Sequence, residues 1–280
     1  MKPSGSLGRR LPSALGKQVV LALFAVVCLF PVYYLFVTAF KSQGEYLQNL
    51  FGLPLNPVLG NFATVFRGRR FLRWFANSVI LMSGSVLASL VIAVLAAYAF
   101  ARMRFRGRDG LLGFILVLMI VPPVVMVIPL FKIMIALRIL NTYPSVIVIY
   151  AGLTLPFSIY MLSSFFRTIP EAIIDSARID GCRDLRLVRS IAVPLSVPAL
   201  ITVVLVNALW VWNELLIAVI FLQRDELKTL MVGLTIFKSR YNLDIPVTMA
   251  GLAVATVPML ALYFAGQKHF IRGLVAGAVK

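Results

Sequence analysis

Six long runs of apolar residues, separated by short and mostly basic segments, dominate the pattern along this chain. A continuous run is typical of a membrane-spanning α-helix, because about 20 helical residues cross about 30 Å of hydrocarbon and satisfy their own backbone. Strands of a membrane barrel would instead alternate apolar and polar positions. We therefore predict an all-α, polytopic membrane protein with six transmembrane helices. The runs lie at about residues 18–40, 76–100, 111–131, 144–166, 197–221 and 248–266.

The runs divide the chain into a membrane domain and two short ends. Residues 1–17 are basic and carry no acid, and the apolar run after them is longer than the core of a cleaved signal peptide. We interpret this run as a retained first span. The resulting prediction is a basic cytoplasmic N-terminus at 1–17, a transmembrane domain at 18–266 and a cytoplasmic tail at 267–280.

Three prolines interrupt the third run, at Pro122, Pro123 and Pro129. Each removes a backbone N–H donor and obstructs the preceding helical turn. We therefore expect a kink in this span, at a place where neighbouring helices or a cavity satisfy the freed carbonyls.

The composition agrees with a membrane protein and excludes several other classes. Of the 280 residues, 61% are hydrophobic and 13% are charged, whereas soluble domains carry about 25% charged residues. This excludes an ordinary soluble enzyme and a disordered protein. The formal net charge is +17, but the basic residues sit between apolar runs, where they anchor spans to anionic lipid. We therefore expect membrane lipid, and no nucleic acid, as a partner.

The placement of arginines predicts which way the spans cross the membrane. The very short segment 101–110 holds four arginines, and short basic loops stay on the cytoplasmic side. With an even number of spans, we predict a multi-pass protein of the cell membrane (inner or plasma membrane) whose N- and C-termini are both cytoplasmic. The arginines between 67 and 73 fall on the opposite side. An interfacial amphipathic helix and a snorkelling flank of the second span explain them equally well.

The segment 167–196, between the fourth and fifth runs, is too charged to enter lipid and predicts a helix–turn–helix element. Thr168 and Glu171 have the spacing of a helix capping box, and Gly181 can adopt the left-handed conformation that ends a helix. The apolar stripe beside the charges comprises Ile173, Ile174, Ala177 and either Cys182 or Leu185. Two interpretations stay open: the stripe binds a partner on the cytoplasmic face, or it packs against the ends of the chain's own helices.

Several short motifs give the chain a specific resemblance to a known family. The segments Asp175-Ser176-Ala177, Asp180-Gly181, Pro194-Leu195 and Pro198 resemble the EAA loop of permease subunits in binding-protein-dependent ABC importers. In that family Glu usually stands at position 175 and Ala at position 176, whereas the Asp-Gly pair is intact. Four further stretches resemble the maltose-permease branch, which takes up carbohydrates: YAFARMRFRGR at 98–108, LNTYPSVI at 140–147, WNELL at 212–216 and RGLVAGAVK at 272–280.

The resemblance implies a permease subunit that forms half of a sugar pathway and is driven by another protein's ATP hydrolysis. Its coupling helix, between transmembrane helices 4 and 5, would dock in a groove of a cytoplasmic ATPase. The implied coupling residues are Glu171, Asp175, Ser176, Ala177, Asp180 and Gly181. The implied partners are a second permease subunit (giving a heterodimer), two cytoplasmic ATPase subunits and an extracytoplasmic solute-binding protein.

The sequence carries no sign of catalysis by the chain itself. It lacks a G-x-x-x-x-G-K-[ST] phosphate loop, so ATP and Mg should bind to the partner ATPase and no cofactor to this chain. We also expect no catalytic residues and no metal site, because no nucleophile–base pair or metal-ligand spacing is apparent. An ion-driven secondary transporter of small polar solutes is the alternative function. It would usually show more acids within its spans or an internal repeat.

Glu214 is the only acid within the predicted spans, and it follows Trp210, Trp212 and Asn213. An ionisable group at this depth needs water, protein or a partner around it, and aromatic rings beside carboxylate and amide groups suit sugars. One hypothesis is that Asn213 and Glu214 line the translocation pathway. The other is that Glu214 makes a structural hydrogen bond that holds helices together.

Overall fold

The computed structural model describes the backbone of residues 7–67, 69–240 and 244–278, and the side chains of 16–67, 70–235 and 244–267. Within these ranges every regular element is a helix, which confirms the predicted all-α membrane fold. The chain forms two compact units: Met1–Gly68 with Phe237–Val254, and Arg69–Ile236 with Ala255–Lys280. The side chains of the predicted tail beyond Gln267, and those of most of the N-terminal segment, lie outside the described residues.

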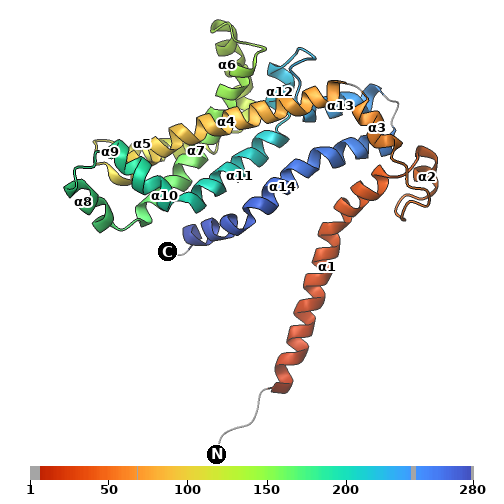
Figure 1. Ribbon diagram of the computed structural model, residues 1–280, viewed down its shortest axis with the longest axis horizontal. Coiled ribbons are helices and arrows are strands. Elements are labelled where there is room, and N and C mark those ends of the chain that lie inside the picture. Colours follow the sequence, from red (N-terminus) through yellow and green to blue (C-terminus); the bar gives the residue numbers. More distant parts are fainter. Residues whose placement is uncertain (1–6, 68, 241–243, 279–280) are drawn as a thin grey trace, which may run out of the picture. The chain divides into compact units, whose positions relative to one another are not determined.

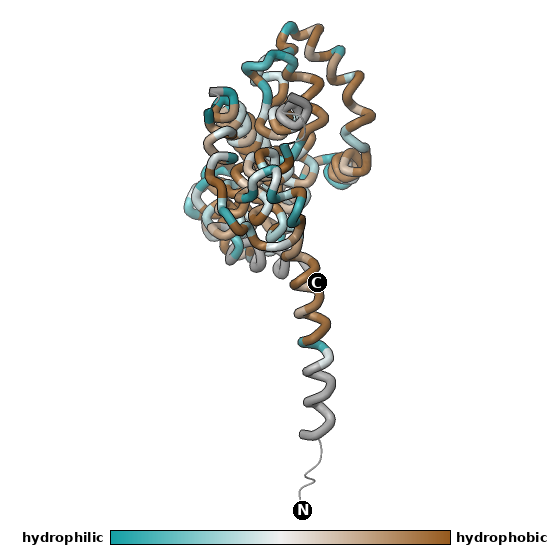
Figure 2. Tube along the Cα trace, turned by 90° about the vertical axis from the view of Figure 1, so that its right-hand side faces the viewer, coloured by the Kyte–Doolittle hydropathy of each residue, from teal (hydrophilic) through white to brown (hydrophobic). Residues whose placement is uncertain are grey.

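The first unit contains the first span. Its helices include α1 (Leu7–Ala39), α2 (Gln43–Gln48) and α3 (Gly60–Phe66). The stretch Gly16–Ala39 of α1 is long and apolar enough to cross a membrane, and its most apolar window is not buried inside the chain. Figure 2 shows this part of α1 as a mainly hydrophobic helix. The side chains of this window are therefore exposed.

The second unit is built around α4 (Arg69–Arg102), α7 (Tyr143–Thr168) and α11 (Val197–Asn213). α4 packs along α7, and α11 packs against both of them (Figure 1). One apolar cluster surrounds the C-terminal halves of α4 and α7, and a second surrounds their N-terminal halves. These contacts join the second, fourth and fifth apolar runs into one packed bundle.

The third run is a sharply bent pair of helices rather than one continuous helix. It consists of α5 (Arg108–Leu118) and α6 (Pro123–Ala136), which are bent by 101° relative to one another. Pro122 is extended, and two consecutive prolines remove two backbone donors at this point. The predicted kink is confirmed, but the prediction of a single helix over 111–131 is wrong.

The remaining helices complete the membrane domain. The connection after α7 comprises α8 (Glu171–Ile179), α9 (Asp184–Leu187), the π-helix η1 (Val188–Ala192) and α10 (Val193–Leu195). After α11 come α12 (Leu216–Phe221), α13 (Leu230–Arg240) and α14 (Ile245–Ala278). Among the described residues four helical stretches can cross a membrane unbroken, and counting each of two bent helix pairs as a span gives up to six.

Candidate functional site

Pro170 separates α7 from α8 and sets where α8 begins. Because proline disfavours a helical residue before it, Ile169 is extended, with φ −66° and ψ 126°, and caps the end of α7. Thr168 still belongs to α7, and its hydroxyl donates to the carbonyl of Phe165 at 2.8 Å. The predicted capping box is therefore wrong: Pro170 is the N-cap of α8 and makes no side-chain cap.

Gly181 ends α8, as predicted. Its φ of 78° lies in the left-handed region. The backbone N–H of Cys182 donates to the carbonyl of Ala177 at 2.9 Å, and that of Gly181 to the carbonyl of Arg178 at 3.0 Å. These two bonds form a Schellman motif, the commonest glycine-dependent helix end. A Cβ at position 181 would meet no atom within 4 Å, so glycine is required here by the backbone conformation and not by space.

α8 has one buried face and one exposed face. Ile174 and Ala177 are buried in the apolar cluster that also holds Phe166 and Leu187. Ile174 and Ala177 therefore attach α8 to its own bundle, and among the expected anchors Ile173 is the exposed one. The exposed positions of α8 and its C-cap include Glu171, Ile173, Asp175, Ser176, Ile179 and Asp180. The packing interpretation of the stripe holds for Ile174 and Ala177, and binding of a partner by the exposed face stays a prediction.

Arg102, the last residue of α4, joins α4 to the junction of α7 and α8. Its guanidinium donates to the carbonyl of Phe166 from Nε at 3.0 Å and from Nη2 at 2.6 Å, and Nη2 also donates to the carbonyl of Ile169. Carbonyls at the end of a helix lack partners within it, and the helix dipole favours a cation there. Arg102 thus fixes the direction in which the chain leaves α7 toward α8.

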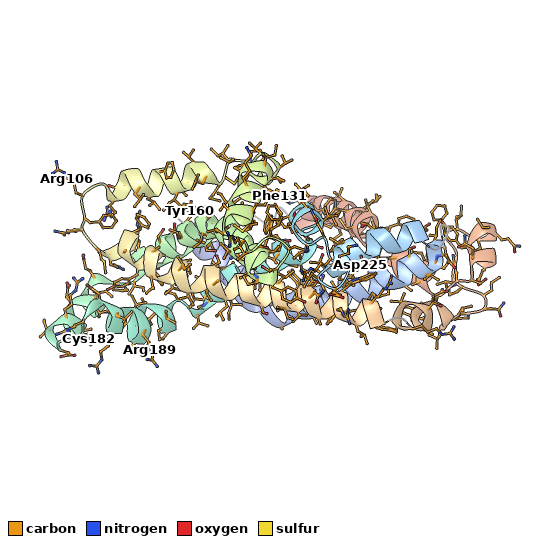
Figure 3. All side chains as sticks on the ribbon, turned by 90° about the horizontal axis from the view of Figure 1, so that it is seen from above. Arg106, Phe131, Tyr160, Cys182, Arg189 and Asp225 are labelled. Atoms are coloured by element: carbon orange, nitrogen blue, oxygen red, sulfur yellow. The ribbon has the colours of Figure 1, made fainter. Side chains whose placement is uncertain are left out.

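α8 and the residues that follow it lie at the same end of the second unit as the arginine-rich segment 101–110. Figure 3 shows Arg106, Cys182 and Arg189 together at one end, whereas Asp225 lies away from them, past Tyr160 and Phe131. The most basic loop and α8 are therefore on one side of the bundle.

Glu214 sits at the break between α11 and α12. Its carboxylate accepts the backbone N–H groups of Ile217 at 3.0 Å and Ala218 at 3.2 Å, and the hydroxyl of Tyr150 donates to it at 2.7 Å. The carboxylate satisfies donors in the first turn of α12 and lies at the positive end of its dipole. This geometry favours the structural interpretation, in which Glu214 holds α7, α11 and α12 together.

Asn213 differs from its neighbour. Its side chain is exposed, and its amide donates to a backbone carbonyl one turn earlier in its own helix at 2.8 Å. Trp212 is buried, and its indole N–H donates to a carbonyl of α14 at 3.2 Å. Trp210 is half-buried and meets the ring of Tyr150 edge-on, with the ring centroids 5.8 Å apart. Of the two predicted pathway residues, Asn213 is free to face a solute, whereas Glu214 is engaged in the helix break.

Comparison with known proteins decides the family. Residues 89–275 match the family described as the binding-protein-dependent transport system inner membrane component. The chain belongs to this family. It is a permease subunit of an ABC importer, a transport protein and not an enzyme, which confirms the family that the sequence motifs resemble.

Similarity to individual permeases extends over nearly the whole chain. The putative ABC transporter permease protein ORF2 of Caldicellulosiruptor sp. is 38% identical over 263 residues, covering 94% of this chain and 95% of that protein. The diacetylchitobiose uptake system permease protein DasC of Streptomyces coelicolor is 33% identical over 265 residues, covering 94% and 96%. A crystal structure of a bacterial ABC transporter that imports the acidic polysaccharide alginate aligns with a TM-score of 0.84 at 26% identity, over 96% of this chain and 100% of that chain.

The permease also buries a row of polar side chains that the sequence analysis missed. Thr154 donates to Ser89 at 3.0 Å, and Asn207 donates to Ser158 at 2.8 Å, so the row connects α4, α7 and α11. Thr154, Asn207 and Trp210 contribute to the lining of a cavity of about 250 Å³. In the sequence, Asn207 lies seven residues before Glu214, a spacing that places two residues on the same side of a continuous helix. This spacing was the available signal for a polar row at Asn207.

The LNTYPSVI stretch of the permease holds a loop at the other end of the bundle. Asn141, with φ 62°, accepts two backbone N–H groups of the loop 222–229 at 3.0 and 3.2 Å. The hydroxyl of Tyr143 donates to Asn77 at 2.7 Å, and Asn77 donates to two carbonyls of the same loop. This motif is therefore a connection between α4, α7 and the loop that follows α12.

We predict that Glu214→Ala lowers the thermal stability of the purified permease complex. The change leaves the hydroxyl of Tyr150 and the N–H groups of Ile217 and Ala218 without their acceptor, and each buried unsatisfied group costs about 1–3 kcal/mol. Asn213→Ala is the matched control, because its exposed amide bonds only within its own helix, and it should melt like the wild type. Thermal unfolding in detergent measures both. Normal melting of Glu214→Ala together with lost uptake would instead assign Glu214 to the pathway.

We predict that Arg102→Gln weakens coupling while the protein still inserts and assembles. Losing the charged hydrogen bonds to the end of α7 removes about 2 kcal/mol of stabilisation at the α7–α8 junction, so α8 should be held less firmly on the bundle. Uptake per ATP hydrolysed should fall several-fold. Arg102→Lys should restore it only partly, because a single ammonium does not reproduce the planar fork of arginine.

The control for Arg102→Gln is Arg106→Gln. Arg106 is exposed in the same segment, 101–110, and its replacement by glutamine also removes one positive charge. If the two variants change the ratio of uptake to hydrolysis equally, the effect is one of loop charge and the positioning role of Arg102 is wrong.

Proposed function

We propose that this permease forms one half of the translocation pathway of a carbohydrate importer, and that α8 transmits to it the movement of a separate ATPase. The observation that carries the proposal is α8 itself, a helix fixed to the bundle by one face, exposed on the other and ended at Gly181. A sugar as solute is supported by relatives named for the uptake of diacetylchitobiose and of alginate.

The proposed orientation places α8 in the cytoplasm. The arginines of 101–110 lie at the same end of the second unit as α8 (Figure 3), and short basic loops favour the cytoplasmic side. With six crossings, the N- and C-termini are then both cytoplasmic. The loop 222–229 lies at the extracytoplasmic end in this arrangement.

The exposed face of α8 has the composition of a docking surface. Ile173 and Ile179 are exposed, the latter by 86%, and they stand among Glu171, Asp175 and Asp180. An apolar centre inside a polar rim is the usual anatomy of a protein interface. We propose that this face, with Ser176, contacts the ATPase, and that Ala177 and Gly181 act by fixing the orientation and the end of the helix.

Force on α8 has two routes into the membrane in this mechanism. The first is the apolar cluster in which Ile174 is buried with Tyr98 and Phe166. The second is the set of hydrogen bonds from Arg102 to the end of α7. Close-packed side chains have few voids and transmit displacement, so α8, α7 and α4 would move together when the ATPase changes state.

The remaining components of the proposed importer are separate proteins. A second permease subunit supplies the other half of the pathway, two cytoplasmic ATPase subunits bind ATP and Mg, and an extracytoplasmic binding protein delivers the sugar. The absence of a phosphate loop from the 280-residue sequence supports the division of labour.

Within the membrane, we propose that Asn213 and the cavity beside Asn207 face the solute. Trp210 contributes an aromatic surface to that cavity, and Thr154 and Asn207 contribute polar atoms. Sugars offer hydroxyl groups to polar side chains and C–H faces to aromatic rings. Glu214 supports this region by closing the helix break rather than by contacting the sugar.

Purification and reconstitution test the proposed function. The tagged permease, extracted from its native membrane, should carry along an ATPase and a second permease. In proteoliposomes supplied with the importer's binding protein, purified separately, uptake of a labelled oligosaccharide from a panel should require internal ATP. Uptake against a gradient by this chain alone, with only a proton or sodium gradient, would overturn the proposal.

We predict that Gly181→Val uncouples the importer. A β-branched residue at φ 78° is strained, by about 1–2 kcal/mol or more, so the Schellman end of α8 should open and its exposed face should shift. ATP hydrolysis should persist while uptake falls several-fold. Gly181→Asn is the matched control, since asparagine tolerates the left-handed region, and it should retain most uptake. Equal uptake by the valine and asparagine variants would contradict the docking geometry.

A further inference from the structure

The segment after α2 combines strong exposure of apolar side chains with a complete lack of charge. Residues 46–66 contain no Lys, Arg, Asp or Glu. Leu53 is 66% exposed and Leu55 80% exposed. The other exposed large apolar side chains between α2 and α3 and at their edges are Leu47, Leu50, Phe51 and Leu59. Exposure of such a surface to water is unfavourable, so an apolar partner is expected to cover it.

Contacts with α1 place Phe51 of this segment beside the C-terminal turns of the first span. The ring of Phe51 lies 6.0 Å from that of Phe30 and 5.8 Å from that of Tyr34, and the hydroxyl of Tyr33 donates to the carbonyl of Phe51 at 3.0 Å. Phe30 precedes the last residue of α1, Ala39, by nine positions, which is about 13 Å along a helix. The chain therefore turns back alongside the span after leaving it, as the first unit in Figure 1 shows.

The backbone of this segment is supplied with partners by nearby side chains. Lys41 is completely buried, and its Nζ donates to the carbonyls of Asn49 at 2.7 Å and Leu50 at 3.3 Å. The side chain of Asn49 accepts the N–H of Gly52 at 2.8 Å and donates to the carbonyl of Leu53 at 3.2 Å. A backbone that bonds to its own chain in this way is suited to a medium without water.

Side chains also bond to the backbone at both ends of the segment. The carboxylate of Glu45 accepts the N–H of Leu55. The amide of Asn61 donates to the carbonyls of Ala39 and Lys41, each at 2.8 Å, and so satisfies the end of α1. These bonds hold residues 49–55 in one fixed shape that directs Leu53 and Leu55 outward.

We infer that residues 49–55 form an interfacial loop that inserts into the lipid leaflet in which α1 ends. Its exposed leucines continue the lipid-facing surface of α1, whose apolar window is not buried in the chain. A protein interface usually surrounds its apolar centre with a polar rim that includes charged residues, and the stretch 46–66 contains no charged side chain. Lipid at the boundary of headgroups and acyl chains requires only apolar side chains and a satisfied backbone.

Spin labelling of the assembled transporter tests the inference. A nitroxide is attached at Leu53→Cys in a chain carrying Cys28→Ser and Cys182→Ser, and the complex is reconstituted without binding protein into vesicles of phosphatidylethanolamine and phosphatidylglycerol. Collision rates with oxygen, which concentrates in lipid, and with a nickel chelate, which stays in water, are measured. Two further chains give the references. The lipid reference is native Cys28, exposed on α1, labelled in a chain that carries only Cys182→Ser. The water reference is Gln223→Cys, exposed in a polar loop, in the chain without native cysteines.

The expected oxygen-to-nickel ratio at position 53 is close to that at Cys28 and several-fold above that at position 223. A nickel accessibility equal to that at 223 would overturn the inference and indicate a surface open to a soluble protein. Low accessibility to both reagents would overturn it as well, because the loop would then be packed against another subunit. Leu55→Cys gives an independent reading if the first variant does not assemble, and neither measurement depends on transport or ATP.

Discussion

Every backbone N–H and C=O group within the hydrocarbon layer needs a partner from the protein, and this constraint governs the whole permease. A continuous helix meets it by itself, but several spans of this chain are interrupted or end in bonds to other elements. At three of these places a side chain supplies the missing partner. Arg102 donates to the carbonyls at the end of α7, and Glu214 accepts the N–H groups at the start of α12. Beyond α1, the side chains of Lys41 and Asn49 donate to backbone carbonyls of residues 49–53.

The same bonds give the coupling helix a defined position. α8 follows a break that Pro170 imposes, and an unsupported break would let the helix swing relative to the bundle. Arg102 on one side of the break and the buried face of α8 on the other remove that freedom. In the proposed mechanism, a displacement of α8 would therefore be carried into α4 and α7. The bonds that keep this junction folded are the same ones on which that proposed coupling depends.

Continuous apolar runs made the membrane class and the approximate spans predictable, because length and lack of alternation depend on local sequence alone. Proline likewise marked the break in the third run. The break at Glu214 was not predictable in this way, since no proline or glycine stands there and the partners come from Tyr150 and the following turn. The burial of Ala177 and the role of Arg102 also depend on contacts between distant elements. Gly181 was predictable because a left-handed helix end is a local requirement.

Three of the stretches that resemble the carbohydrate branch of the family are places where elements are joined. YAFARMRFRGR contributes Arg102, LNTYPSVI contributes the bonds of Asn141 and Tyr143, and WNELL contributes Glu214. A side chain whose bonding capacity is used in closing the fold has little left for a solute. Asn213, in contrast, is exposed and bonded only within its own helix. In the proposed function, discrimination between sugars would therefore fall to Asn213 and to the lining of the cavity beside Asn207. That proposal assigns the fold and the choice of solute to different residues, even where those residues are neighbours in the sequence.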